Sequence, residues 1–405
     1  MDADGFAFLL TPRGQRLLGA AMSAYDDTDV LALSERLRRT DRALAAEHVA
    51  AAITQAGLRR SAAAKFGADA TRLYFTSAGL EQGTHPRVAR HRTTRAGAGG
   101  ARPLLDLGCG VGSDLMAFAA AGYAVTGVDS DGLTAAVAAA NLAVLGLGGS
   151  VIEGTAQDAD RAGFAAVFAD PARRQGATRV FDPRAFSPSW DFVLSLLGPG
   201  PSVAGQPGQV VVKLGPGLDH DLVPPLVEAE WVSLDGDLKE VALWSPPPSR
   251  GTTRRRATLL TAAGGEASLT EADAPVGAPP ISAVGDFVYE PDPAVIRAHL
   301  VSVVVGGVAG WLLDPHLAYV SSDRDVASPF ARRFRVLEVL PFRERQLRPA
   351  LRSRGIGALT IKKRGIAVTP EELRRRLALH GDQHATLILT RTPGSAAALL
   401  VEPLP

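Results

Sequence analysis

The sequence predicts an α/β protein with a mostly parallel seven-stranded sheet, a helical region before the sheet and a small α+β domain after it. Short apolar runs alternate with helical segments from about residue 103, which is the pattern of a parallel sheet covered by helices. Apolar residues recur at three- and four-residue spacing before that point, and a strand and helix pattern resumes near residue 331. With 405 residues, 46% of them hydrophobic and 21% charged, the chain is long enough for two or three globular domains.

Residues 1–95 are expected to form a helical N-terminal domain. Segments such as 45–58 have apolar residues at helical spacing. Asp41 is a candidate cap for this segment, and Gly57 is a candidate for its end. The Ala- and Gly-rich stretch 96–101 then predicts a connection to the sheet domain.

The sheet domain is expected over residues 96–265. Five strands are predicted from short apolar runs, at 103–106, 124–129, 150–153, 165–170 and 209–214. Two further runs, 240–244 and 257–260, are joined only by a loop rich in Pro, Gly and Arg. A connection without a helix predicts a hairpin, and therefore one antiparallel edge strand on an otherwise parallel sheet.

The rest of the chain is expected to contain a connection and a second small domain. Residues 266–330 predict a linker and helical connection, because their first part is rich in Gly, Ala, Pro and acids and 292–313 has the pattern of one helix. Residues 331–405 predict a compact β-α-β-α-β-β unit that ends in a hairpin around Pro393 and Gly394.

This C-terminal tail carries a local excess of positive charge. The whole chain has a net charge of +1, but 14 Arg or Lys side chains stand against four Glu between Arg332 and Arg376. The cluster Lys362, Lys363 and Arg364 lies at a strand end and is expected to bind substrate by contacting phosphates. The alternative is a basic helix face exposed to solvent.

The composition excludes several classes of site and of location. Cys109 is the only cysteine, which excludes an internal disulfide framework and a cysteine-rich zinc site. The eight histidines have no metal-ligand spacing, so no metal is expected. The longest nearly apolar run, 300–313, is too short to span a bilayer, and the start of the chain has no basic leader. We therefore expect a cytoplasmic protein without a membrane partner.

The strongest chemical signal is the run LLDLGCGVGSD at residues 104–114, where a strand ends in Asp106 and a helix follows a glycine turn. The turn contains Gly108, Gly110 and Gly112. Glycines let backbone N–H groups approach a ligand closely. Asp129 ends the next strand, where a carboxylate can accept both ribose hydroxyls. Because an acid before the turn suits an ammonium group better than a pyrophosphate, the pattern predicts S-adenosyl-L-methionine. A dinucleotide, or a turn that binds nothing, is the alternative.

On these motifs, residues 100–260 resemble the class I S-adenosylmethionine-dependent methyltransferases. The resemblance implies a Rossmann-like seven-stranded methyltransferase sheet, with Asp106 near the methionine moiety, the three glycines against the cofactor and Asp129 on the ribose. In that family an acid after the third strand lies near the adenine amino group. The corresponding place here has the sequence GTAQD, in which we favour Asp158 over Thr155.

The fourth predicted strand ends in Asp170-Pro171, followed by Ala172-Arg173. Members of this class that methylate exocyclic amines of bases carry Asp/Asn/Ser-Pro-Pro-aromatic at this place, because the carboxylate accepts hydrogen bonds from the amine and orients its lone pair. We therefore expect Asp170, Pro171 and Arg173 to be catalytic, with the Arg173 guanidinium stacked on the base. A helix-starting Asp-Pro turn is the alternative. Lys213, at the end of the fifth strand, is expected to contact RNA or to be a structural lysine.

Two flanking stretches, 73–95 and 178–193, resemble the corresponding parts of trimethylguanosine-synthase-like methyltransferases. Nearly the whole chain is similar to a bacterial group with a methyltransferase core and a C-terminal THUMP-like domain. This resemblance implies an RNA-modifying enzyme. It also implies that Glu81, Gln82 and Thr84 lie where a loop can fold over the cofactor, although a plain polar turn is the alternative.

The main prediction is a cytoplasmic methyltransferase that transfers a methyl group from S-adenosyl-L-methionine to a base nitrogen in structured RNA, tRNA or rRNA, by direct displacement. Carbon-5 methylation of pyrimidines is excluded, because it needs a cysteine nucleophile and Cys109 lies inside the glycine turn. The alternatives are a small-molecule methyltransferase and a non-catalytic protein that binds S-adenosylmethionine and RNA.

Overall fold

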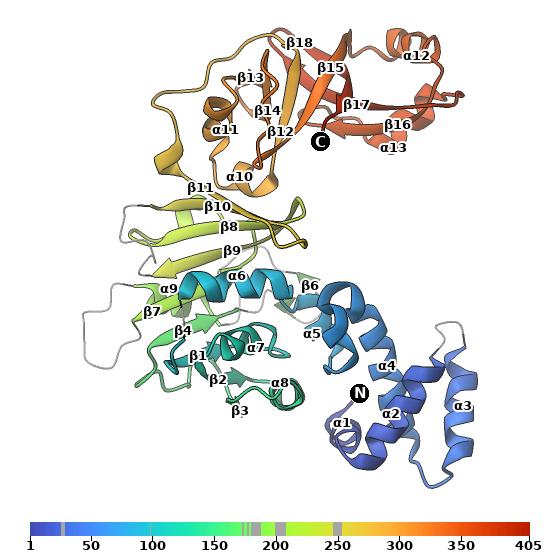
Figure 1. The fold of residues 1–405 in the computed structure, drawn as a ribbon, viewed down its shortest axis with the longest axis vertical. Helices are drawn as coiled ribbons and strands as arrows, with labels where there is room; N and C mark the ends of the chain where they lie inside the picture. Colours follow the sequence, from blue (N-terminus) through green and yellow to red (C-terminus); the bar gives the residue numbers. More distant parts are fainter. Residues whose placement is uncertain are drawn as a thin grey trace. The chain divides into compact units, whose positions relative to one another are not determined.

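The computed structural model describes residues 1–25, 29–97, 99–171, 188–198, 208–245 and 253–405, together with the backbone of 174–175 and 178–179. The chain divides into two compact units. The first unit consists of Met1–Val227 and Ala242–Arg250, and the second of Glu228–Val241 and Gly251–Pro405. Figure 1 labels the helices and strands of each unit.

The first unit begins with helices (Figure 1). They are α1 (Ala3–Leu9), α2 (Pro12–Ala24), α3 (Val30–Thr40), α4 (Ala46–Phe66), the 3-10 helix η1 (Gly67–Thr71), α5 (Ser77–Gln82) and α6 (Pro86–Ala96). Helix α4 runs through Gly57, where an added Cβ would lie 2.4 Å from the Tyr25 hydroxyl, so packing rather than a helix end explains this glycine. Asp41 does not cap α4 and instead forms an ion pair with Arg13 at 2.5 Å. In the described part of the chain, no helix has both the length and the apolar character that crossing a membrane requires.

Five parallel strands follow in the first unit. They are β1 (Pro103–Leu107), β2 (Ala124–Asp129), β3 (Ser150–Glu153), β4 (Ala166–Ala169) and β7 (Gln209–Leu214), in the order β7–β4–β1–β2–β3. All the pairings between these neighbours are parallel, which confirms the prediction for this part of the sheet. The helices among them are α7 (Ser113–Ala120), α8 (Gly132–Val144) and α9 (Trp190–Leu197), and a short antiparallel pair joins β5 (Arg174–Gln175) to β6 (Thr178–Arg179). The apolar core of this region includes Leu104, Phe118 and Phe168.

The strands that continue this sheet differ from the prediction. They are β9 (Asp237–Ser245), β8 (Glu228–Leu234), β10 (Arg255–Leu260) and β11 (Glu266–Thr270), so the described strands number nine along the order β11–β10–β8–β9–β7–β4–β1–β2–β3 rather than seven. The hairpin joins β8 to β9 through Asp235 and Gly236, whose φ angles of 52° and 83° suit a tight two-residue turn. The prediction that 240–244 pairs with 257–260 is wrong, because β10 pairs with β8 in parallel and with β11 in antiparallel fashion.

The missed strand β8 has polar side chains on a buried face. Glu228 and Glu230 are fully buried. The carboxylate of Glu228 is 2.7 Å from Arg256 Nε, and Glu230 accepts a hydrogen bond of 2.6 Å from the Thr258 hydroxyl. A run with two acids does not have the apolar pattern of a buried strand, so local periodicity does not predict β8. The acids can be buried because their partners, Arg256 and Thr258, lie on β10, far along the sequence.

A second sheet fills the C-terminal part of the second unit. Its strands are β12 (Phe287–Pro291), β13 (Trp311–Asp314), β14 (Leu317–Ser322), β15 (Ala331–Pro341), β16 (Ile356–Lys363), β17 (Gln383–Thr392) and β18 (Ser395–Pro403), in the order β13–β14–β12–β15–β18–β17–β16. The remaining helices are η3 (His220–Leu222) in the first unit and η4 (Glu271–Asp273), α10 (Pro293–Arg297), α11 (Val301–Gly307), α12 (Glu344–Arg352) and α13 (Pro370–Leu377) in the second. The predicted β-α-β-α-β-β order is present from β15 to β18.

Residues 266–330 are not a linker. They contribute β11 to the first sheet and β12, β13 and β14 to the second. The expected single helix over 292–313 is two short helices and a strand. Gly310 lies between the helix and the strand, and an added Cβ there would be 2.4 Å from the Ser321 carbonyl oxygen, so this close backbone approach requires glycine.

The second sheet is strongly curled. One face is covered by α12 and α13, whose apolar side chains pack on it, among them Leu347, Leu351, Leu373 and Leu377. Strand β16 is separated from β12 by three strands, yet Lys362 Nζ on β16 lies 2.6 Å from a Glu290 carboxylate oxygen on β12. Arg391 on β17 similarly reaches Asp314 on β13, at 3.1 Å. The face away from α12 and α13 is therefore concave.

Candidate active site

The glycine turn joins β1 to α7 at the carboxyl end of the parallel strands. Gly108, Gly110 and Gly112 have φ angles of 80°, 57° and 87°, a region that strains any residue with a side chain. A Cβ on Gly108 would lie 3.1 Å from the Asp170 carbonyl oxygen, so the ends of β1 and β4 approach closely. The turn is thus a place where backbone, rather than side chains, faces the end of the sheet.

Asp129, the last residue of β2, is bonded to the glycine turn. One carboxylate oxygen accepts a hydrogen bond of 2.9 Å from the Gly110 N–H, and the other accepts one of 3.0 Å from the Asp131 N–H. Each oxygen has a second lone pair with which it can accept a hydroxyl proton. Glu153, which the sequence did not single out, is the register neighbour of Asp129 on β3.

Asp106 is a buried carboxyl group whose two oxygens have no hydrogen-bond partner among the described residues. Burial, followed by the negative charge of Asp170, raises the pKa of this carboxyl to about 8. A buried acceptor that is left without a donor on its own chain is costly. The arrangement therefore fits an external donor, and a positively charged donor best.

A chain of polar contacts, which we call the Lys213 network, lies beside Asp106. Lys213 Nζ donates to Asp170 Oδ2 at 2.5 Å and to the Thr84 hydroxyl at 3.0 Å. The Thr84 hydroxyl in turn donates to Asp114 Oδ2 at 2.5 Å. Arg92 forms an ion pair with Asp114, and its guanidinium lies 4.7 Å from the centre of the Phe168 ring.

The charges of this region do not balance when every group is ionised. Among the described residues, Asp106, Asp114, Asp129 and Asp170 supply four carboxyl groups, whereas Arg92 and Lys213 supply two cations. The Asp170 side chain is 31% exposed, and that of Lys213 is 10% exposed. An external cation near Asp106 would therefore reduce the excess negative charge of the site, and Asp170 retains an accessible side.

Helices α5 and α6 bring Thr84 and Arg92 to the site. An added Cβ on Gly79 would lie 2.2 Å from Val111 Cγ1, and one on Gly83 would lie 2.7 Å from the Ser113 hydroxyl. The segment therefore packs directly on the glycine turn, with Thr84 buried, whereas Glu81 and Gln82 are exposed on α5. Arg92 and Asp114 were not predicted.

The helix spacing accounts for the burial of Arg92 once the buried face of α6 is known. Arg92 lies four residues after Val88 on α6, and both side chains are buried, which places them on the same helix face.

The remaining predicted residues lie in the loop after β3, beside Asp170, outside the described residues or in the second unit. Asp158 is exposed in the loop after β3 and accepts a hydrogen bond of 2.6 Å from the Thr155 hydroxyl. Pro171 is buried directly after Asp170. Arg173 lies outside the residues that the structure describes. The cluster Lys362, Lys363 and Arg364 belongs to the second unit.

The site offers little for cysteine chemistry. Cys109 is buried, and burial raises the pKa of its thiol. A neutral buried thiol is a poor nucleophile, so this side chain acts as a small apolar filler against Gly127 and Leu115. In the described ranges, no three His, Cys, Asp or Glu side chains are grouped as metal ligands would be.

Comparison with known proteins gives two matches over most of the chain. Two proteins of Mycobacterium tuberculosis, from strains CDC 1551 and H37Rv, are each 35% identical over 348 residues, which cover 82% of this chain and 90% of each relative. Both are described as uncharacterized S-adenosylmethionine-dependent methyltransferases.

A crystal structure and two family models add to these matches. The crystal structure, described as that of a methyltransferase from Porphyromonas gingivalis W83, has a TM-score of 0.74 at 21% identity, and the match covers 94% of this chain and 100% of that chain. This similarity is one of fold. The family model "THUMP domain-like" matches residues 331–403, and "Domain of unknown function (DUF8688)" matches residues 2–62.

Proposed function

This chain belongs to the S-adenosylmethionine-dependent methyltransferases, and from that premise we propose that it methylates a base nitrogen in structured RNA, tRNA or rRNA. The observation that carries the proposal is Asp170 at the end of β4. Its carboxylate is held by Lys213 at 2.5 Å and has an accessible side, and its backbone carbonyl oxygen lies against Gly108 of the glycine turn. A fixed acceptor in this place suits a base amine.

The residues of the first unit fit S-adenosyl-L-methionine. Asp106 offers two carboxyl oxygens, without a hydrogen-bond partner among the described residues, for the ammonium group of the methionine moiety. The glycines Gly108, Gly110 and Gly112 allow close approach of the cofactor to the backbone. Asp129 has lone pairs for the ribose hydroxyls, and Asp158 is the proposed contact of the adenine. When bound, the cofactor supplies an electrophilic methyl group.

Asp170 is the proposed orienting residue for the substrate nitrogen. Because Lys213 donates to Oδ2, Oδ1 is the oxygen that can accept a hydrogen bond from the substrate amine. That bond would orient the nitrogen lone pair for methyl transfer, and the Asp170 carboxylate would accept the proton that the nitrogen loses. Proximity and orientation supply most of the rate increase.

The second unit supports RNA as the substrate. The THUMP domain-like match covers the region from β15 to β18, where positive charge is concentrated. Part of this charge is neutralised by acids that precede residue 331. Glu290 pairs with Lys362, and Asp325 pairs with Arg333. Lys363 is exposed at the end of β16 and is a proposed phosphate contact.

Methyl transfer to RNA from a strain that lacks this protein tests the proposal. The purified chain is incubated with radiolabelled S-adenosylmethionine and with tRNA and rRNA from that strain and from the wild-type strain. We expect label on one base of the unmodified RNA only. Label in small molecules alone, in a parallel incubation with a cell extract, would favour the small-molecule methyltransferase. Cofactor binding without label in any fraction would favour the non-catalytic protein, which the lack of an aromatic residue after Asp170-Pro171 also supports.

A further inference from the structure

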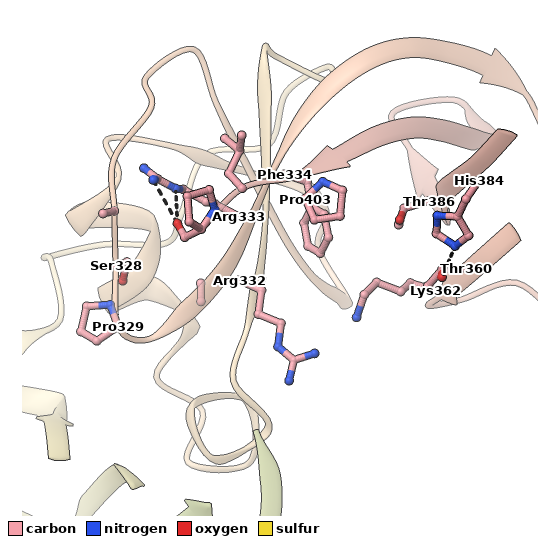
Figure 2. A pocket seen from close by; sticks show the side chains of 14 residues that line it. Ser328, Pro329, Arg332, Arg333, Phe334, Thr360, Lys362, His384, Thr386 and Pro403 are labelled. Atoms are coloured by element: carbon pink, nitrogen blue, oxygen red, sulfur yellow. Dashed lines mark hydrogen bonds between the residues drawn. The ribbon is translucent and has the colours of Figure 1, made fainter. Parts of the chain in front are cut away.

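The second unit contains a cavity of about 710 Å³ on the concave face of its C-terminal sheet (Figure 2). Four adjacent strands, β15, β18, β17 and β16, contribute to its lining, together with residues 327–329. The volume is in the range of about 300–1,000 Å³ that is typical of small-molecule sites. All residues that line the cavity belong to the second unit, whereas Asp170 and the glycine turn belong to the first.

The strand alternation explains which side chains reach this cavity. Residues two apart on one strand point to the same face. Thr360 and Lys362 on β16, His384 and Thr386 on β17, and Arg332 and Phe334 on β15 all line the cavity in such pairs. The alternate residues on β16 and β17, such as Ile361 and Leu387, pack beneath α12 and α13.

The lining separates into an apolar floor and a polar wall. Phe334 is buried opposite Pro403, its register partner on β18. Figure 2 shows these two side chains in the middle, with Thr360, His384 and Thr386 gathered on one side. His384 Nε2 lies 3.0 Å from the Thr360 hydroxyl. The hydroxyls and the imidazole can donate and accept hydrogen bonds at the edge of a flat group that rests on the floor.

The charges around the cavity favour an anion. Lys362 and Arg364 share the single carboxylate of Glu290, at 2.6 and 3.9 Å. Arg332 is exposed, is the register partner of Glu290 and also interacts with the Asp292 carboxyl group, so three cations stand against two acids among the described residues. Arg333 is balanced by Asp325 at 2.7 Å. In Figure 2 the ends of the Lys362 and Arg332 side chains lie on the same side of Phe334 and Pro403, and Lys362 Nζ donates there to Glu290.

An apolar floor, a hydrogen-bonding edge and excess positive charge match the three parts of a nucleotide. We propose that this cavity binds one nucleotide of single-stranded RNA, with the base on Phe334 and Pro403, the base edge at His384 and the threonine hydroxyls, and the phosphate at Arg332 and Lys362. This proposal rests on the proposed function and deepens it, because it assigns a recognition site on the RNA away from the methylated base.

The test measures binding of the full chain to mixed-sequence RNA hexamers by fluorescence anisotropy. Arg332→Ala and His384→Ala change exposed side chains, so the fold should be retained, and thermal melting checks this. Each substitution should weaken hexamer binding by about tenfold, the cost of one lost charged or edge-directed hydrogen bond. Arg375→Ala removes the same charge from an exposed position on α13 and should leave affinity within about twofold.

Competition experiments identify what the cavity recognises. Adenosine, guanosine, cytidine and uridine 5′-monophosphates should displace the hexamer, whereas ribose 5-phosphate and inorganic phosphate should do so at much higher concentration. Equal competition by inorganic phosphate would overturn the role of the base. Tight mononucleotide binding, with hexamer affinity unchanged in Arg332→Ala and His384→Ala, would overturn the assignment to RNA.

The failure of this proposal can be told apart from failure of the proposed function. If the wild-type chain methylates RNA while both variants bind hexamers normally, the cavity is not the RNA site and the function stands. If the wild-type chain labels no RNA, the proposed function fails, whatever the cavity binds. An equal loss of affinity in Arg375→Ala would show general attraction by positive charge and would also overturn the cavity proposal.

Discussion

At the scale of single residues, the site is defined by carboxyl groups in contrasting surroundings. Asp170 has a cation at 2.5 Å and is partly open, whereas Asp106 is fully buried without a donor among the described residues. Sequence reasoning found both acids from their places at strand ends. It did not predict the difference between them, because burial and the nearest cation depend on Lys213 and Arg92, which are far along the chain.

Binding of S-adenosylhomocysteine should release a proton from Asp106. The pKa of this carboxyl is raised to about 8 in the free protein, so at pH 7 the group is mostly protonated. An ammonium group placed against it favours the ionised form and lowers the pKa, so the proton leaves on binding. Calorimetry at pH 7 in buffers of different ionisation enthalpy should show a release that approaches one proton and disappears by about pH 10.

Asp106→Asn should bind more weakly and release no proton. Asp237→Asn, which changes a side chain that is 82% exposed, should behave like the wild type. Identical binding enthalpies for the wild type in every buffer would contradict the assignment of Asp106 to the ammonium group.

Asp129→Ala should weaken binding of S-adenosylhomocysteine by about 1–3 kcal/mol, because it removes the proposed acceptor of the ribose hydroxyls. It also removes the bond to the Gly110 N–H, so part of the loss reflects a looser turn. Asp129→Asn retains one acceptor oxygen and should lose less. Titration calorimetry measures both, and unchanged affinity in Asp129→Ala would remove the ribose from this end of β2.

Asp170→Ala should lower the methylation rate far more than it lowers cofactor affinity. An interaction made mainly in the transition state affects turnover rather than ground-state binding. Asp170→Asn should be milder, since an amide oxygen still accepts a hydrogen bond from the substrate amine. Single-turnover assays with the unmodified form of the RNA that the wild-type chain labels measure this. A near-normal rate for Asp170→Ala would show that the turn after β4 has a structural role only.

At the scale of elements, the parallel strands alone do not complete the site. Helix α6 contributes Arg92, the loop before it contributes Thr84, and the start of α7 contributes Asp114. The close packing of Gly79 and Gly83 on the glycine turn explains why this segment accompanies the sheet. Its helices are predictable from their spacing, but the identity of the buried arginine is not, because α6 also carries Arg87, Arg90 and Arg95.

Breaking the Arg92–Asp114 pair should destabilise the first unit strongly. Arg92→Met leaves the buried Asp114 carboxylate without its cation, and such a loss typically costs about 3–5 kcal/mol. The double substitution Arg92→Met with Asp114→Leu removes both charges and should cost less than Arg92→Met alone. Urea unfolding of the wild type, Arg92→Met, Asp114→Leu and the double variant measures the coupling. A double variant that is less stable by the full sum of the single effects would mean that the two side chains act independently.

At the scale of the whole molecule, the sequence predicted the layout well where local pattern and tertiary structure agree. The five parallel strands, the glycine turn and the order of elements from β15 to β18 were predicted, because short apolar runs and turn residues mark them directly. The errors arose where distant partners decide the structure. Buried Glu228 is satisfied by Arg256, and Gly310 is required by the approach of Ser321. Neither partner can be identified from local periodicity.

The presence of β12, β13 and β14 before residue 331 changes the expected boundary of the C-terminal domain. The family match begins at residue 331, but β15 has β12 as its neighbour on one side. Val288, Leu313 and Tyr319, from β12, β13 and β14, share an apolar cluster with Ile388 and Leu399 of β17 and β18. A fragment that starts at 331 would lack this half of the cluster and leave one edge of β15 unpaired.

We therefore expect residues 279–405 to fold on their own and residues 331–405 not to do so. The longer fragment contains all seven strands of the sheet and Ile281, which bridges to Leu312. Without β12, the edge of β15 and the apolar side chains beneath it become exposed, which favours aggregation over folding. Circular dichroism and amide NMR spectra should show cooperative unfolding and dispersed signals for 279–405 only. A well-dispersed spectrum for 331–405 would show that β12 to β14 are dispensable. Since β15 to β18 supply most of the cavity lining and the fragment would lack only residues 327–329 of it, that result would also allow nucleotide binding to be measured in the shorter fragment.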